Sequence, residues 1–126
     1  MLQPNEEIRI AYLFPGLWVL ADKLLIPCLQ NYAIDAIEEY RKTTGNIATY
    51  AIPYIYENTS KNSPLRRFFV ETCTWYLRGT CYKEWPNDFP KEMLLDLSAM
   101  FRELVKPNLS SKQREMAQFH VKEEDN

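Results

Sequence analysis

Glycine is scarce in this chain, with three glycines among 126 residues, and alternation of apolar and polar residues is rare. A β-sandwich or β-barrel needs a turn every ten residues or so, and such turns favour glycine. A phosphate-binding loop needs clustered glycines, and these three are far apart. No apolar run approaches the ~20 residues that cross a bilayer. The composition therefore disfavours all-β folds, phosphate-binding loops and transmembrane helices.

Histidine and cysteine are also rare. The one histidine, His120, lies in a polar C-terminal stretch, and Cys28, Cys73 and Cys81 show no metal-like spacing. We therefore expect no catalytic residue, no metal site and no cofactor, and we predict buried thiols in a reducing intracellular compartment, the cytoplasm or nucleus. Fifteen basic and seventeen acidic residues give a net charge of −2, so nucleic acid and membranes are not expected partners.

Apolar residues recur at spacings of three and four, which predicts an all-α fold of about five helices. The expected helices run over 17–26, from 27 to a stop at Gly45, over roughly 47–57 with Pro53 inside, over 64–78, and from 89 to Pro107. Ser63 and Asp88 are the expected N-caps of the last two helices. The expected divisions of the chain are an irregular segment over 1–16, a helical module over 17–107 and a polar, disordered tail over 108–126.

Two motifs then show a family resemblance. Residues 17–33 read LWVLADKLLIPCLQNYA, and a second segment reads YIYENT over 54–59 followed by SPLRR over 63–67. The first resembles the last helix pair of BTB/POZ domains, and the second is similar to a segment of fungal BTB/POZ proteins. Trp75 and FPKEM over 89–93 also fit, so the resemblance covers roughly 17–104.

This resemblance implies a BTB C-terminal helix pair followed by a BACK-like helical extension. Only sixteen residues precede Leu17, so we expect the N-terminal sheet core of a BTB domain to be missing. The implied function is a non-catalytic protein–protein interaction module of a scaffold or adaptor, linked in the family to cullin-type ubiquitin ligases. A transcriptional-regulator scaffold without a ligase role is the alternative. A helix-turn-helix DNA binder is less favoured, because Asp35, Glu38 and Glu39 would repel phosphates.

The interaction surface expected from the sequence has two parts. The main apolar stripe of the first helix, expected to face inward, is Leu17, Leu20, Ala21 and Leu24. Trp18, Val19 and Leu25 lie off this stripe, and we expect them to be exposed. Such a patch predicts self-association or binding to a BTB-containing partner. Arg66 and Arg67 form a basic corner with Lys61. The corner is either solvated, or held in an intramolecular salt bridge, or a contact for an acidic partner. Other proteins are the expected partners, with no small-molecule substrate.

Overall fold

The computed structural model describes residues 4–105 and 116–121. These residues form six α-helices and three short 3-10 helices and contain no strand, so the expected all-α fold is confirmed. The elements are α1 (Pro4–Lys23), α2 (Pro27–Thr44), η1 (Thr49–Ala51), α3 (Ile52–Asn58), α4 (Pro64–Tyr76), α5 (Cys81–Glu84), η2 (Pro86–Asp88), α6 (Lys91–Leu104) and η3 (Met116–Phe119).

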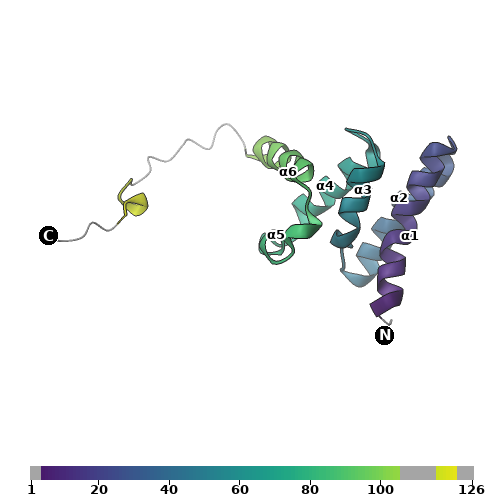
Figure 1. The fold of residues 1–126 in the computed structure, drawn as a ribbon, viewed down its shortest axis with the longest axis horizontal. Coiled ribbons are helices and arrows are strands. Elements are labelled where there is room, and N and C mark those ends of the chain that lie inside the picture. The colour runs from purple at the N-terminus through teal and green to yellow at the C-terminus, as the bar shows by residue number, and fades with distance from the viewer. Residues whose placement is uncertain (1–3, 106–115, 122–126) are drawn as a thin grey trace.

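The helices of residues 4–105 are arranged from one end to the other in nearly their sequence order. In Figure 1, α1 and α2 lie side by side at one end, α3 and α4 occupy the middle, and α5 and α6 form the opposite end. One apolar core connects these helices. Helix α4 contributes Leu65 and Phe69 to it, and other helices contribute residues such as Ile55 of α3, Met93 of α6 and Trp18 of α1. Helix α4 is therefore the central element.

Several helix boundaries follow from local sequence signals and confirm the predictions. Pro27 is in the first turn of α2, where its missing N–H is not needed. Gly45 ends α2 at φ 74°, a left-handed conformation that glycine adopts without steric cost. The hydroxyl of Ser63 caps α4 by accepting from the N–H of Arg66 at 3.3 Å. Pro53 is in the first turn of α3, so that helix begins late, as its proline indicates.

The N-terminal segment differs from its prediction. From Pro4 onward it is helical, and α1 runs through Pro15 and Gly16 to end at Lys23, three residues before the expected end. A proline inside a helix costs about 3 kcal/mol because it removes a hydrogen bond. Burial outweighs that cost here, because Ala11, Pro15 and Trp18, spaced by four and three residues, form one buried face of α1. The helical module therefore begins near Pro4.

The prediction of which side of α1 faces the core is also wrong. Trp18 and Val19, expected to be exposed, are 2% and 4% exposed, whereas Leu20 and Leu24 of the expected inward stripe are 51% and 58% exposed. Helix α1 has apolar residues on both sides, and the indole of Trp18 gains more from burial than a leucine does. Leu25 is exposed, as expected, in the turn between α1 and α2.

The region after α4 is more structured than predicted. Helix α4 ends at Tyr76 rather than near Gly79, and the expected loop over 79–88 contains α5 and η2. Asp88 does not cap the next helix, because its carboxylate accepts from the hydroxyl of Thr49 at 2.8 Å and α6 begins at Lys91. The apolar spacing of the last helix predicts that Leu94, Phe101 and Leu104 face inward, but in α6 these residues are each 42–43% exposed.

The expected tail lies mostly outside the described residues. Residues 106–115 and 122–126 are not described, and the disorder predicted over 108–126 is therefore untested there. Of the described part, η3 is a short 3-10 turn, and His120 follows it as an exposed residue.

Candidate interaction surface

Arg66, expected at a basic corner, is a buried cation held by several acceptors. Its guanidinium donates to the hydroxyl of Thr59 at 2.9 Å, to the backbone oxygens of Tyr56 and Thr59 at 2.7 and 2.6 Å, and to Glu92 at 2.9 Å. Only 6% of Arg66 is exposed. Of the alternatives for Arg66, the structure therefore contains the intramolecular salt bridge. Arg67, one residue on, is exposed.

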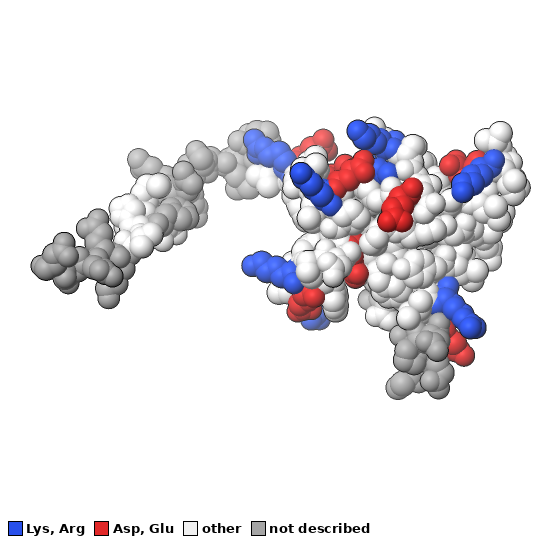
Figure 2. Space-filling model, viewed as in Figure 1, with Lys and Arg blue, Asp and Glu red and all other residues white. Residues whose placement is uncertain are grey.

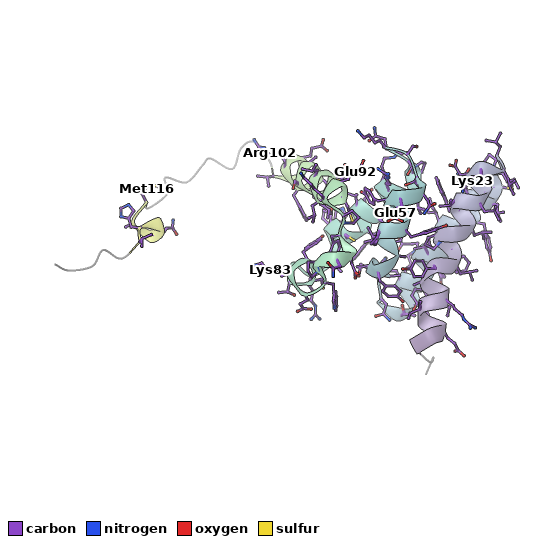
Figure 3. All side chains as sticks on the ribbon, in the orientation of Figure 1. Lys23, Glu57, Lys83, Glu92, Arg102 and Met116 are labelled. Carbon is purple, nitrogen blue, oxygen red and sulfur yellow. The ribbon has the colours of Figure 1, made fainter. Side chains whose placement is uncertain are left out.

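The ring of Tyr56 completes this group. The guanidinium carbon of Arg66 lies 4.4 Å from the centre of that ring, and the Tyr56 hydroxyl donates to Asp96 at 2.7 Å. Burial, followed by the hydrogen bond to Asp96, raises the pKa of the Tyr56 phenol. We call Arg66, Tyr56, Thr59, Glu92 and Asp96 the arginine cluster. It ties α3, α4 and α6 together, and Figure 3 shows Glu92 on the side of α6 that faces the middle of the molecule.

The side chains best placed for binding are three exposed aromatics on another part of the surface. Trp75, Tyr76 and Trp85 are 61%, 59% and 50% exposed. Trp75 and Tyr76 end α4, and Trp85 lies between α5 and η2. We call these three residues the aromatic patch. Tryptophan and tyrosine are the residue types most enriched where binding energy concentrates in protein interfaces.

A contact from the neighbouring helix α2 holds Tyr76, the middle residue of the aromatic patch, in position. The guanidinium carbon of Arg41 lies 3.8 Å from the centre of the Tyr76 ring, and Arg41 also pairs with Glu38, three residues before it on α2. The backbone N–H of Trp85 donates to the backbone oxygen of Cys81 at 3.0 Å. The contact with Arg41 positions the Tyr76 ring before any partner binds, which reduces the entropy that binding would cost. The backbone hydrogen bond fixes the path of the chain at Trp85.

Two shallow hollows border the patch. Tyr76 and Trp85 line one of about 350 Å³, together with the loop at Asn46. Trp75 lines another of about 200 Å³, with Glu38 and Glu71 beside it. Aromatic faces next to carboxylates suit apolar and cationic side chains of a partner. Figure 2 shows Lys and Arg scattered among Asp and Glu over the visible face, with no large area of one sign.

The cysteines do not form a reactive site. Cys73 and Cys81 are buried and unpaired, and burial, with the nearby Cys81 sulfur, raises the pKa of the Cys73 thiol to about 12. A thiol with so high a pKa is almost entirely protonated at pH 7 and is a poor nucleophile. Cys28 was predicted to be buried, but it is exposed because it lies at the start of α2 on the side away from Ala33. Among the residues that the structure describes, no group of three metal-ligating side chains comes together.

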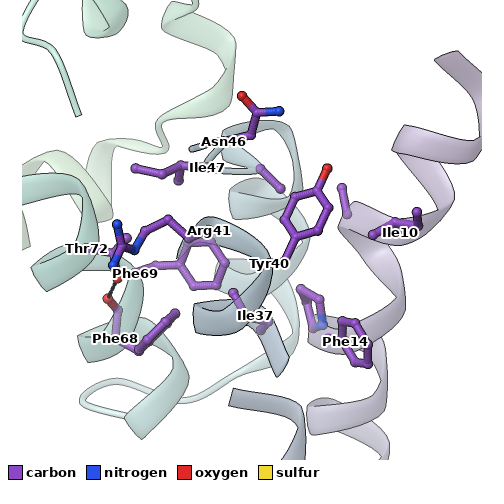
Figure 4. Close-up of a pocket in the computed structure, with 13 residues that line it drawn as sticks. Ile10, Phe14, Ile37, Tyr40, Arg41, Asn46, Ile47, Phe68, Phe69 and Thr72 are labelled. Carbon is purple, nitrogen blue, oxygen red and sulfur yellow. Dashed lines mark hydrogen bonds between the residues drawn. The ribbon is translucent and has the colours of Figure 1, made fainter. Parts of the chain in front are cut away.

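An apolar cavity lies between α1, α2 and α4. Figure 4 shows Ile10 and Phe14 of α1 on one side of it, with Ile37 of α2 and Phe69 of α4 on others. Its enclosed space is about 20 Å³, room for roughly one water molecule. It is therefore too small for a cofactor or substrate. Among the described helices, none has the length and apolar character needed to span a membrane.

Neither the aromatic patch nor the arginine cluster is predicted by the sequence patterns. From sequence, aromatic residues such as Trp75, Tyr76 and Trp85 are expected mostly in the core, and those off the inward stripes are alternatively interface anchors. The position of Trp85 next to Pro86 in a turn-rich segment is a signal of surface location. Arg66 gave no sequence signal of burial, because its acceptors come from α3, from Thr59 just after α3, and from the distant α6. Comparison with known proteins finds no matching family model, no matching curated protein and no matching solved structure.

Proposed function

We propose that this chain is a non-catalytic protein–protein interaction module of a BTB/POZ-type scaffold or adaptor, and that the aromatic patch is its main partner-binding surface. The observation that carries the binding proposal is the exposure of Trp75, Tyr76 and Trp85 around two adjoining hollows, with the Tyr76 ring held by Arg41. Large aromatic side chains that are fixed in position lose little entropy when a partner covers them.

The BTB/POZ assignment rests on the two motifs, and their positions in the fold support it. Within the first motif, the LADK sequence of residues 20–23 ends α1 at Lys23. The Ile26-Pro27 junction starts α2, as in a helix pair joined by a tight turn. The YIYENT and SPLRR motifs contribute Tyr56, Thr59 and Arg66 to the arginine cluster. These motif residues therefore have a structural role, which leaves partner binding to other side chains.

The partner we propose is a protein that presents apolar and basic side chains. Such side chains would cover the rings of Trp75 and Trp85 and pair with Glu71, since Glu38 already pairs with Arg41. Within the BTB/POZ proposal, the partner determines the role. A cullin among the partners would make the chain a ubiquitin-ligase adaptor, and transcription factors without a cullin would make it a regulator scaffold.

Affinity capture from a lysate of the cells in which the protein occurs naturally, with the full chain as bait, tests the proposal. We expect the double variant Trp75→Ser/Trp85→Ser to lose proteins that the wild-type chain retains, with little change in melting temperature because both side chains are exposed. The control is Arg102→Ser, at an exposed position on α6, which should retain them. Identical captured proteins for wild type and double variant would overturn the role of the patch, and capture of neither a cullin nor a transcription regulator would overturn the BTB-type role.

A further inference from the structure

The side of α1 that faces away from the core is a continuous apolar surface. Leu13, Leu20 and Leu24 are 57%, 51% and 58% exposed, and Leu17 between them is partly buried. No charged residue occurs over the twelve positions 10–21 of this helix. In Figure 2 the visible flank along α1 is uncharged between the charges at its two ends. We call Leu13, Leu17, Leu20 and Leu24 the leucine seam.

Neighbouring elements cover the other sides of α1 and leave the seam open. On one side, the Tyr12 hydroxyl donates to the backbone oxygen of Tyr50 at 3.0 Å. On another, Phe14 makes an edge contact with Tyr32 of α2, with ring centres 6.4 Å apart. Tyr32 is itself 60% exposed, so it extends the apolar surface from α1 onto α2.

The spacing of the seam indicates what it binds. Its leucines follow one another at intervals of four, three and four residues, the spacing of a helix that packs against another helix by knobs into holes. With Glu6 and Ile10 the same side reads 6, 10, 13, 17, 20, 24, and this series is symmetric about position 15. When two such helices run antiparallel, Leu13 of one therefore lies opposite Leu17 of the other.

We propose that α1 pairs antiparallel with α1 of a second copy of this chain through the leucine seam. The charges favour this orientation. Parallel helices would bring the two Glu6 carboxylates together, whereas antiparallel helices place each Glu6 between Arg9 of its own helix and Lys23 of the second copy. Figure 3 shows Lys23 at the end of α1 opposite the N-terminus.

The size of the seam sets the strength of the pairing. Twelve helical residues extend about 18 Å, which is short for an interface even with Tyr32 and the exposed Leu25 at its margin. Interfaces of this size are at the weak, concentration-dependent end of specific association. The aromatic patch lies on other elements, so this pairing leaves Trp75 and Trp85 free for a different partner.

Sedimentation equilibrium of the full chain tests the pairing. The weight-average mass should rise with concentration from 15.0 kDa towards twice that value, over about 1 to 300 µM, the range expected for a weak interface. The double variant Leu13→Ser/Leu20→Ser should stay at the monomer mass, and Leu95→Ser, at a 60% exposed position on α6, should behave as the wild type. A monomeric wild type, or a double variant that dimerises as well as the wild type, overturns the proposal.

Disulfide trapping tests the orientation and distinguishes it from unspecific association. In a Cys28→Ser background, Leu13→Cys and Leu17→Cys chains with different affinity tags are mixed and oxidised. Antiparallel pairing predicts that the mixed disulfide forms at least tenfold faster than either like-with-like disulfide. Faster like-with-like trapping would overturn the antiparallel arrangement. If the chains do not pair in these assays but the wild-type chain still captures its partners through the aromatic patch, the pairing proposal fails and the proposed function stands.

Discussion

The guanidinium of Arg66 lies over the ring of Tyr56, with its central carbon 4.4 Å from the ring centre. The same guanidinium donates to the backbone oxygen of Tyr56, so one residue contacts both the ring and the backbone of the other. A buried cation is expensive to desolvate unless its donors are satisfied, and here backbone oxygens, a hydroxyl and Glu92 accept from them. Arg66 therefore fixes the end of α3 against α4 and α6.

Replacing Arg66 should be strongly destabilising. Lysine cannot reach the separate acceptors as the planar guanidinium does, and buried backbone oxygens of Tyr56 and Thr59 would lose their donors. We expect Arg66→Lys to lower the free energy of unfolding by about 3 kcal/mol, measured by urea denaturation. Arg67→Lys, at an exposed neighbour, should change it by less than about 0.5 kcal/mol. Equal effects of the two changes would contradict the cluster.

Gly45 should tolerate a side chain poorly because of its backbone conformation. Its φ of 74° lies in the left-handed region, although nothing stands within 4 Å of the position a Cβ would take. We expect Gly45→Ala to destabilise the fold by about 1 kcal/mol, measured by thermal unfolding. Gly79 also has open space around it and is not at positive φ, so Gly79→Ala is the matched control and should be neutral or slightly stabilising.

The buried Cys73 thiol should make stability fall at alkaline pH. Its pKa is about 12 in the folded chain and ordinarily 9.0, so above pH 9 the unfolded chain releases a proton that the folded chain keeps. Below pH 9 the Cys73 thiol is protonated in both the folded and the unfolded chain, so it does not change stability with pH. As the pH rises from 9 towards 12, the free energy of unfolding falls by about 1.4 kcal/mol per pH unit.

A comparison with Cys73→Ala isolates that effect. At pH 7 the variant should be less stable by about 1 to 2 kcal/mol, because it loses packing of the sulfur. Near pH 10.5 the wild type should have lost about 2 kcal/mol through the thiol, so the two chains should become about equally stable. Urea denaturation at both pH values checks this, and a stability difference that stays constant would contradict a buried, protonated thiol.

The orientation of α1 makes opposite predictions for two residues close in sequence. Trp18 is 2% exposed and Leu20 is 51% exposed. Trp18→Ala should therefore cost about 3 to 5 kcal/mol, whereas Leu20→Ala should change stability little. The measurement is urea denaturation at low micromolar concentration, where pairing through the leucine seam is weak. A larger loss for Leu20→Ala would restore the inward stripe predicted from the sequence.

Three helix boundaries were predictable because their causes are local. Pro27, Gly45 and Ser63 act through the turn in which they lie, and each is where the sequence places it. The buried side of α1 was not predictable, because both of its sides are apolar and only the tertiary fold selects the side of Trp18. The partners of Arg66 are likewise set by tertiary structure.

The aromatic patch depends on where α4 ends. Trp75 and Tyr76 continue the pattern of a buried helix, so the sequence alone favours burial for both. Because α4 ends at Tyr76, no following turn covers them, and α5 leads the chain away towards α6. The exposure of Trp85 follows from its position between two short helices.

Site-specific photo-crosslinking in the producing cells tests the central claim, that a protein partner covers the aromatic patch. Benzoylphenylalanine would replace Trp75 or Trp85 in the full chain, and Arg102 on α6 in the control, since all three positions are exposed. Irradiation should give discrete adducts of higher mass at Trp75 and Trp85 and little product at Arg102. No adduct at either tryptophan position, or equal adducts at Arg102, would contradict the assignment of this surface to partner binding.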